Sequence, residues 1–170
     1  MRRVLVVYKK SFLESHAQDR ALLRRLPGEL RRKYERADAD NRAAIGDVVE
    51  FLGRQHVRVT AVDRSSMAAN PGYSLVVTVG GDGTFFAASH HVRSTPVLAV
   101  NSDPRTSLGL FACCDRADFR GPLLDALWGR LHTTKLNRLS VRINGVKVRE
   151  FVINDILFAH RNAAAMSHYR

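Results

Sequence analysis

A short apolar run leads directly into three glycines that surround a single carboxylate. The run covers residues 76–79 (Val-Val-Thr-Val), and the turn covers residues 80–84 (Gly-Gly-Asp-Gly-Thr). The β-branched run favours a strand, whereas glycine has no Cβ and so allows positive φ and the close approach of a ligand. A helix that begins near Thr84 would direct its free N–H groups and the positive end of its dipole at the same place. The segment therefore predicts a buried strand, a phosphate-binding turn and a helix.

Asp82 is an unexpected residue in such a turn, because its charge would repel a phosphate. A carboxylate is useful there if it takes a proton from an attacking hydroxyl or holds a divalent cation. The simpler alternative is that Asp82 only caps the helix or forms the turn. The two glycines and the strand before it, and the apolar residues after it, favour the chemical role. We therefore predict that Asp82 is a catalytic residue.

The length and composition fit one globular domain, or one domain and part of another. The chain has 170 residues, of which 45% are apolar and 25% are charged. It contains no apolar stretch near the roughly 18 residues that span a bilayer, so no membrane association is expected. Cys113 and Cys114 are adjacent, a spacing that disfavours a mutual disulfide and matches no zinc pattern. We expect reduced thiols and a cytoplasmic location.

The net charge of +11 raises the question of nucleic acid binding. Many of the arginines lie between Arg20 and Arg36, in a pattern typical of a solvated helix face. No helix-turn-helix signature or set of stacking aromatic residues accompanies them. An anionic small-molecule substrate would explain part of the charge equally well, because a positive field steers anions to the protein. We therefore do not expect a nucleic acid partner.

Strand patterns alternate with helical patterns through the first 134 residues. Strands are predicted at 4–8, 57–62, 75–79 and 96–100, and helices at 12–26, 30–36, 41–55, 85–89 and 119–131. The apolar face of the last helix is predicted to consist of Leu123, Leu124, Leu127 and Trp128. Such alternation predicts an α/β fold with a doubly wound, mainly parallel sheet. Ligands bind such sheets at the carboxyl ends of the strands, where the glycine turn and Asn101 lie.

The pattern changes near Lys135. Apolar and polar residues alternate in 139–143 and again in 146–149, and the Asn144-Gly145 pair between them is a strong hairpin signal. Residues 151–158 predict a further strand with Asn154 and Asp155 in its middle. We therefore expect an α/β nucleotide-binding domain at 1–134 and the beginning of an all-β domain at 135–170. Because few strands follow before the last residue, we also expect a partial protein.

Three motifs, in this order and spacing, resemble the NAD kinase family: the turn at 80–84, Val100-Asn101 and Asn154-Asp155. The similarity extends over nearly all of the chain. Residues 101–109, with an Asp-Pro pair, resemble the divergent branch that includes mitochondrial NAD kinases. Members of the family combine an N-terminal α/β domain with a C-terminal all-β domain. They transfer a phosphoryl group from ATP, or from polyphosphate in some members, to the adenosine 2′-hydroxyl of NAD, and the resemblance implies this reaction here.

The resemblance also implies roles for individual residues. Asp82 is expected to be the general base toward the ribose hydroxyl. The positions expected to bind nucleotide are Gly81, Gly83, Thr84, Phe85, Asn101, Asn154 and Asp155. Mg²⁺ or another divalent cation would arrive with ATP, so no metal site made by the protein alone is expected. ATP and NAD are the expected small-molecule partners, and the resemblance implies a homo-oligomer, a dimer or a tetramer, for the full-length protein.

Other interpretations remain open at this point. Asn154 and Asp155 are also explained as polar residues on an exposed strand face, and the family usually has Glu at the second position. Diacylglycerol and sphingosine kinases carry the same glycine turn, although they continue it with a Leu-Asn-Glu-like segment and not with residues such as 84–87 (Thr-Phe-Phe-Ala). A nucleotide-binding fragment without catalysis is the alternative from a different class. The P-loop and the dinucleotide-binding glycine fingerprint are absent.

Overall fold

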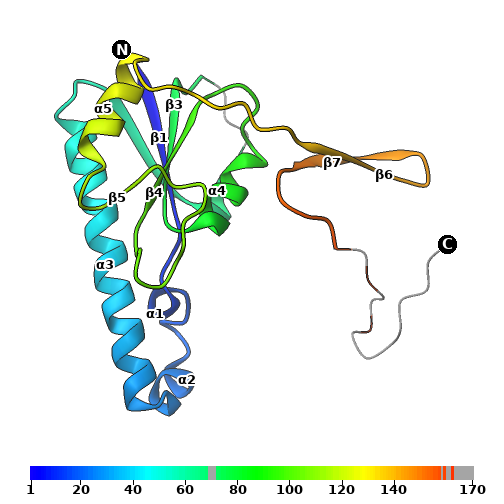
Figure 1. The fold of residues 1–170 in the computed structure, drawn as a ribbon. Helices are drawn as coiled ribbons and strands as arrows, with labels where there is room; N and C mark the ends of the chain where they lie inside the picture. The colour runs from blue at the N-terminus through cyan, green and yellow to red at the C-terminus, as the bar shows by residue number, and fades with distance from the viewer. Residues whose placement is uncertain (69–71, 158, 160–161, 163–170) are drawn as a thin grey trace. The chain divides into compact units, whose positions relative to one another are not determined.

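The computed structural model describes residues 1–68, 72–157, 159 and 162 (Figure 1). These residues form two compact units, Met1–Thr134 and Lys135–Arg170, which we describe separately. Over the described ranges, no helix combines the length and the apolar character needed to cross a bilayer.

A five-stranded parallel sheet forms the centre of the first unit. Its strands are β1 (Arg3–Tyr8), β2 (Arg58–Asp63), β3 (Leu75–Val79), β4 (Val97–Asn101) and β5 (Cys114–Asp115). Their order is β2-β1-β3-β4-β5, and each neighbouring pair is parallel. The chain adds strands on one side of β1 and then on the other, which confirms the predicted doubly wound α/β fold. It also places a topological switch point beside β1, where such folds bind ligands.

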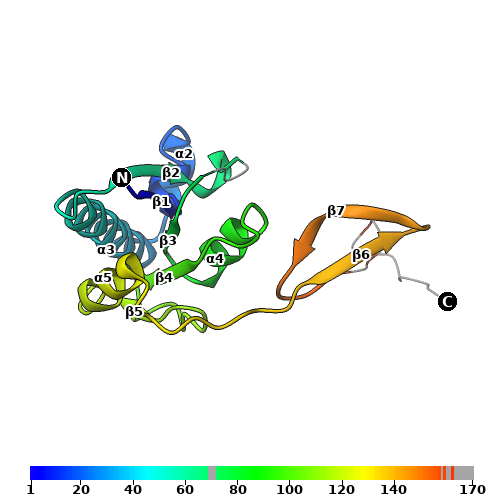
Figure 2. The same ribbon diagram turned by 90° about the horizontal axis from the view of Figure 1, so that it is seen from above.

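Helices cover both faces of this sheet. Figure 2 shows α3 (Gly28–Gly53) and α5 (Arg120–Trp128) on one side and α4 (Asp82–Ser89) on the other. The side chains of β1 alternate between these layers, as the period of a strand requires. Val4 and Val6 pack in the core cluster that contains Leu52 of α3, whereas Leu5 and Val7 pack in the cluster on the side of α4. Because both faces are covered, β3 is buried along its whole length.

The helices between β1 and β2 differ from those predicted. The single helix expected at 12–26 is two short ones, α1 (Phe12–Ser15) and α2 (Arg20–Arg25). The side chain of Asp19 accepts a hydrogen bond from Leu22 N at 2.9 Å and so caps a new helix at that point. The two helices expected at 30–36 and 41–55 are one, α3, because the intervening Ala-Asp-Ala-Asp segment holds neither Gly nor Pro to interrupt it.

The predicted helix at 119–131 is shorter and less amphipathic than expected. α5 ends at Trp128 because Gly129 adopts a left-handed conformation, with φ 68°, and caps it. Leu123 and Leu127 are buried as predicted, but Trp128 is 56% exposed. The guanidinium of Arg2 lies 5.3 Å from the centre of the Trp128 ring and partly covers it.

The second unit contains a two-stranded antiparallel sheet, β6 (Leu139–Ile143) and β7 (Val146–Val152). Asn144 and Gly145 have φ of 49° and 80°, as a tight hairpin turn requires, so the predicted hairpin is confirmed. The strand predicted at 151–158 is wrong, since Val152 pairs with the first residue of β6 and β7 ends there. Phe158 lies outside the described residues.

Asn154 and Asp155 consequently do not lie in the middle of a strand. Both follow the end of β7 and are exposed. The Asn154 side-chain amide donates to the Asp155 carboxylate over 3.1 Å. Their polar groups are thus adjacent at the surface of the second unit.

Candidate active site

The glycine turn begins immediately after β3 and is fixed by its neighbours. Gly80 N donates a 3.0 Å hydrogen bond to Val100 O, at the end of the adjacent strand. Gly80 has φ 155°, and a Cβ at this position would overlap the hydroxyl of Thr84 and lie 3.0 Å from Thr84 Cβ. Only glycine fits between the strand and the helix here, because a side chain would collide with Thr84.

Helix α4 starts at Asp82, before the start near Thr84 and the range 85–89 that the sequence predicted. Thr84 is 1% exposed, and its hydroxyl oxygen has no hydrogen-bond partner among the described residues. Phe85 is also buried, and its ring stacks on that of Phe111 with 4.9 Å between the ring centres. The first turn of α4 is therefore anchored by its inward side chains, while its free N–H groups lie at the carboxyl edge of the sheet.

The carboxylate of Asp82 is held by the loop that follows β4. Leu110 N donates to Oδ2 and Phe111 N donates to Oδ1, each over 3.0 Å. A carboxylate oxygen has two lone pairs, so one acceptor site remains on each oxygen. Asp82 is half-buried and lines a cavity. The two amides therefore fix the orientation of its carboxylate, and each oxygen can still accept a proton.

This cavity, which we call the turn cavity, has a volume of about 370 Å³. It is lined by Lys9, Arg64, Gly81, Asp82, Gly83, Thr84 and Ser107. Lys9 follows β1, Arg64 follows β2, the glycines follow β3, and Ser107 lies in the loop after β4. Four neighbouring parallel strands therefore contribute to one site at their carboxyl ends. Two cations, main-chain N–H groups and hydroxyls surround one carboxylate, which is a suitable set of donors for a phosphorylated ligand.

The two positive charges of Lys9 and Arg64 outnumber the one negative charge in the lining of the turn cavity. Neither forms an ion pair with another described residue, and the cavity holds a single acidic side chain. The sequence analysis did not predict Lys9, Arg64 or Ser107. The signal for the first two was present, since each directly follows a strand whose carboxyl end faces the site. Ser107 belongs to an irregular loop and had no such signal.

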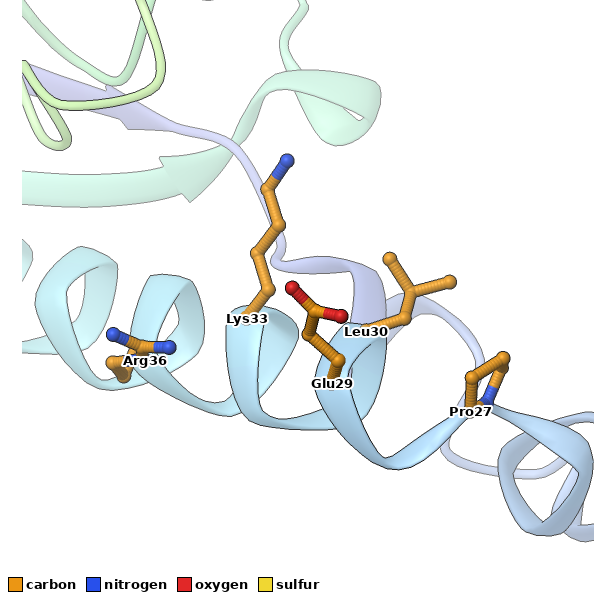
Figure 3. A pocket seen from close by; sticks show the side chains of 5 residues that line it. All are labelled: Pro27, Glu29, Leu30, Lys33 and Arg36. Atoms are coloured by element: carbon orange, nitrogen blue, oxygen red, sulfur yellow. The ribbon is translucent and has the colours of Figure 1, made fainter.

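A second cavity, of about 350 Å³, lies along the first turns of α3 (Figure 3). It is lined by Pro27, Glu29, Leu30, Lys33 and Arg36. All of these residues belong to α3 or immediately precede it, so no strand ends meet there. The cavity carries no glycine turn, and Arg36 and Lys33 are exposed as expected for a solvated helix face. The turn cavity is therefore the better candidate for a site that performs chemistry.

Asn101 acts on the site through its own loop. It is the last residue of β4 and is 5% exposed. Its Nδ2 donates to Ser107 O at 2.9 Å, and its Oδ1 accepts from Asp103 N at 3.1 Å. These bonds shape the loop that supplies Ser107 to the cavity and that continues to the amides of Leu110 and Phe111. Asn101 is thus a positioning residue in this structure.

Asp63 links the two segments that carry the cations. It is 8% exposed, its Oδ2 accepts from Lys10 N at 3.2 Å, and its Oδ1 accepts from Ser65 N at 2.9 Å. Ser65 lies in the short 3₁₀ helix η1 (Arg64–Ser66) that begins with Arg64. Burial raises the pKa of Asp63, but the hydrogen bonds from Ser65 and Lys10 outweigh it and hold the pKa below its ordinary value.

We predict that Asp63→Asn lowers the free energy of unfolding by about 1–2 kcal/mol at pH 7, because Asn loses one of the accepted hydrogen bonds and the charge. The native pKa lies below the unfolded one. The contribution is therefore present above the unfolded value of about 3.9 and is lost as the pH falls through the lower native value. Urea unfolding of both proteins at pH 7 and at about pH 3 measures the difference. An equal difference at the two pH values would contradict this role.

The predicted site residues thus occupy three places. Gly81, Asp82, Gly83 and Thr84 line the turn cavity. Phe85 and Asn101 are buried and support it from α4 and from β4. Asn154 and Asp155 belong to the second unit.

Comparison with known proteins decides the family. The sequence model of the ATP-NAD kinase N-terminal domain matches residues 14–109, which is more than half of the chain. The chain belongs to the NAD kinase family. The matched segment includes the whole glycine turn and ends at Gly109, in the loop that positions Asp82, and the predicted family is confirmed. The family model that matches is that of the NAD kinases and not that of the lipid kinases considered as an alternative.

Named members of the NAD kinase family are similar in sequence to this chain over part of their own length. A probable NADH kinase of Oryza sativa subsp. japonica is 35% identical over 136 residues, which are 69% of this chain and 42% of the rice protein. The NADH kinase of Arabidopsis thaliana is 33% identical over 56% of this chain and 35% of its own length. The NAD kinase of Magnetococcus marinus is 26% identical over 75% of this chain and 48% of its own length. The chain therefore spans less than half the length of these relatives.

Among solved structures, an NAD kinase from Archaeoglobus fulgidus in complex with ATP is similar to this chain. The TM-score is 0.48 at 19% sequence identity, and the match covers 85% of this chain and 45% of that one.

Proposed function

We propose that this chain is the phosphate-binding and catalytic part of an NAD kinase, an enzyme that transfers a phosphoryl group from ATP or polyphosphate to the adenosine 2′-hydroxyl of NAD. One observation carries the proposal. Asp82 lies in a cavity with Lys9, Arg64 and the free N–H groups of α4, so a single carboxylate is placed among groups that bind phosphate. The family match and the names of the relatives support it.

The geometry suits phosphoryl transfer. Such reactions depend mainly on the positioning of the two substrates and on neutralisation of phosphate charge. Lys9, Arg64 and the main-chain N–H groups at the start of α4 would hold the phosphates of the donor. Asp82 would accept the proton of the ribose hydroxyl, and the amides of Leu110 and Phe111 would keep its carboxylate in place during the transfer.

A divalent cation fits this site as part of the donor complex. The described residues contain no group of three or more His, Cys, Asp or Glu side chains that could hold a metal. The lining of the turn cavity offers only Asp82 as an anionic ligand, which suits Mg²⁺ because this ion is commonly held by one or two carboxylates together with substrate phosphates. When bound, Mg²⁺ would neutralise part of the charge on the phosphates.

The remaining proposals concern the acceptor and the whole protein. We propose that Asn154 and Asp155 hydrogen-bond NAD, since they are exposed, adjacent and offer both donors and acceptors. A homo-oligomeric assembly is implied by the family resemblance. The cytoplasmic location stays a prediction from the sequence.

A coupled assay tests the function. The protein is mixed with ATP, Mg²⁺ and NAD, and NADP is measured with an NADP-dependent dehydrogenase, while calorimetry measures the binding of ATP and of NAD. Formation of NADP supports the proposal. Binding of NAD without formation of NADP would favour a non-catalytic nucleotide-binding fragment. Phosphorylation of diacylglycerol in place of NAD would overturn the assigned acceptor.

We predict that Lys9→Ala and Arg64→Ala each weaken ATP binding by about 5- to 20-fold, because each removes a charge-assisted contact in a partly solvated site. The loss should shrink at high salt, since ions screen the interaction. Arg58→Ala is the matched control, because Arg58 is an exposed cation at the opposite, amino end of β2. Equal ATP affinity in the Lys9 and Arg64 variants and in the control would remove these residues from the site.

A further inference from the structure

Cys113 and Cys114 bring two free thiols into contact. Their sulfur atoms are 3.7 Å apart, and each lies 3.8 Å from Ala99 O. Cys113 is exposed, whereas Cys114 is 7% exposed. The proposed phosphoryl transfer uses neither thiol. The pair is held rigidly, since Cys114 lies in β5 opposite Val100, and Cys113 N donates to Ala99 O at 3.1 Å.

The exposed thiol is also the more reactive one. A hydrogen bond from the Cys114 thiol stabilises the thiolate of Cys113 and lowers its pKa to about 7, although burial acts in the opposite direction. The same hydrogen bond, together with burial, raises the pKa of Cys114. A reagent would therefore meet Cys113 first, with the second thiol already in contact.

The spacing of the pair favours a bridging atom over a disulfide. Adjacent Cα atoms are about 3.8 Å apart, below the roughly 4.4–6.8 Å that disulfides span, so a direct bond would require the backbone to distort. An atom that bonds both sulfurs does not require them to come within bonding distance of each other, so the backbone need not distort. Thiolates are soft ligands and prefer soft, thiophilic centres.

We propose that Cys113 and Cys114 form a two-thiol site for trivalent arsenicals, in which one arsenic atom bonds both sulfurs. In the reaction, R–As(OH)₂ and two thiols give R–As(S–Cys)₂ and two molecules of water. Two As–O bonds break and two As–S bonds form, and each hydroxide leaves with a thiol proton. The oxidation state of arsenic does not change, so no further reactant is needed.

Phenylarsine oxide, which exists in water as the dihydroxy species, is the probe. After incubation with the 170-residue chain, intact mass spectrometry is expected to show one phenylarsenic group per chain, and thiol titration is expected to show the loss of both free thiols. The adduct should withstand an excess of a monothiol and be removed by 2,3-dimercaptopropanol. An adduct that leaves one thiol titratable, or that a monothiol removes, would overturn the proposal.

Single variants distinguish arsenic that is bound to both sulfurs from arsenic that is bound to only one. Cys113→Ser and Cys114→Ser are each expected to weaken retention of phenylarsine oxide by about 100-fold or more, because the second bond is then no longer intramolecular. Cys113 is exposed, so its variant is expected to fold normally, and thermal unfolding verifies this. Retention by the Cys113 variant as tight as by the original chain would contradict the site. No step of this test depends on kinase activity.

Discussion

Replacing Asp82 with Asn is expected to reduce the rate of NADP formation by about 10²–10⁴-fold, with little change in the affinity for ATP. Loss of a positioned general base has an effect of this size. Asn has nearly the same shape as Asp but accepts no proton near neutral pH. It retains one oxygen for Leu110 N or Phe111 N and presents an amide nitrogen to the other donor. The substitution thus removes the proton acceptor and one of two loop contacts.

Two comparisons separate the chemical role from the structural one. Asp82→Ala removes both loop contacts, so a purely structural role would make it clearly worse than Asp82→Asn, whereas a chemical role would make the two similarly inactive. Asp125→Asn is the matched control, because Asp125 is a partly exposed carboxylate on α5 that pairs with Arg130. The turnover number, the calorimetric ATP affinity and the thermal midpoint are measured for all. Activity of Asp82→Asn within about tenfold of the original would show that Asp82 is only a turn residue.

The substitution Gly80→Ala is expected to lower the free energy of unfolding by about 2–4 kcal/mol. Two costs contribute to this value, the strain of φ 155° in a residue with a side chain and the overlap of the new Cβ with Thr84. Thr84 is buried and belongs to the first turn of α4, so relieving the overlap would require the start of that helix to shift. Urea unfolding measures the change, and ATP affinity is expected to fall as well, because the start of α4 would be displaced.

Gly46→Ala is the matched control for this prediction. Gly46 lies in α3, a Cβ added there would meet no atom within 4 Å, and its backbone is not left-handed. The same substitution there should raise stability by about 0.5–1 kcal/mol, because Ala is a better helix former. The double variant Gly80→Ala, Thr84→Ala should recover part of the loss, since it removes the overlapping hydroxyl. A Gly80→Ala protein as stable as the original would contradict the requirement for glycine.

Local patterns predicted those parts of the fold in which one short segment decides the outcome. The apolar run of β3 and the turn at 80–84 predicted a strand, a tight turn and a helix, and the Asn144-Gly145 pair predicted the hairpin; both are confirmed. The errors arose where a distant partner or a single cap decides. β7 ends at Val152 because its pairing with β6 ends, and α2 is separate from α1 because Asp19 caps it.

The sequence by itself determined the glycine turn, its carboxylate, the alternation of strands and helices, and the motifs of the NAD kinase family, because each of these is encoded within a few consecutive residues. Only the tertiary structure brought Lys9, Arg64 and Ser107 to Asp82, and only it showed that the amides of Leu110 and Phe111 hold that carboxylate. These groups come from four different strand ends. Their meeting depends on the order β2-β1-β3-β4, which is set by the packing of both faces of the sheet and not by any local pattern.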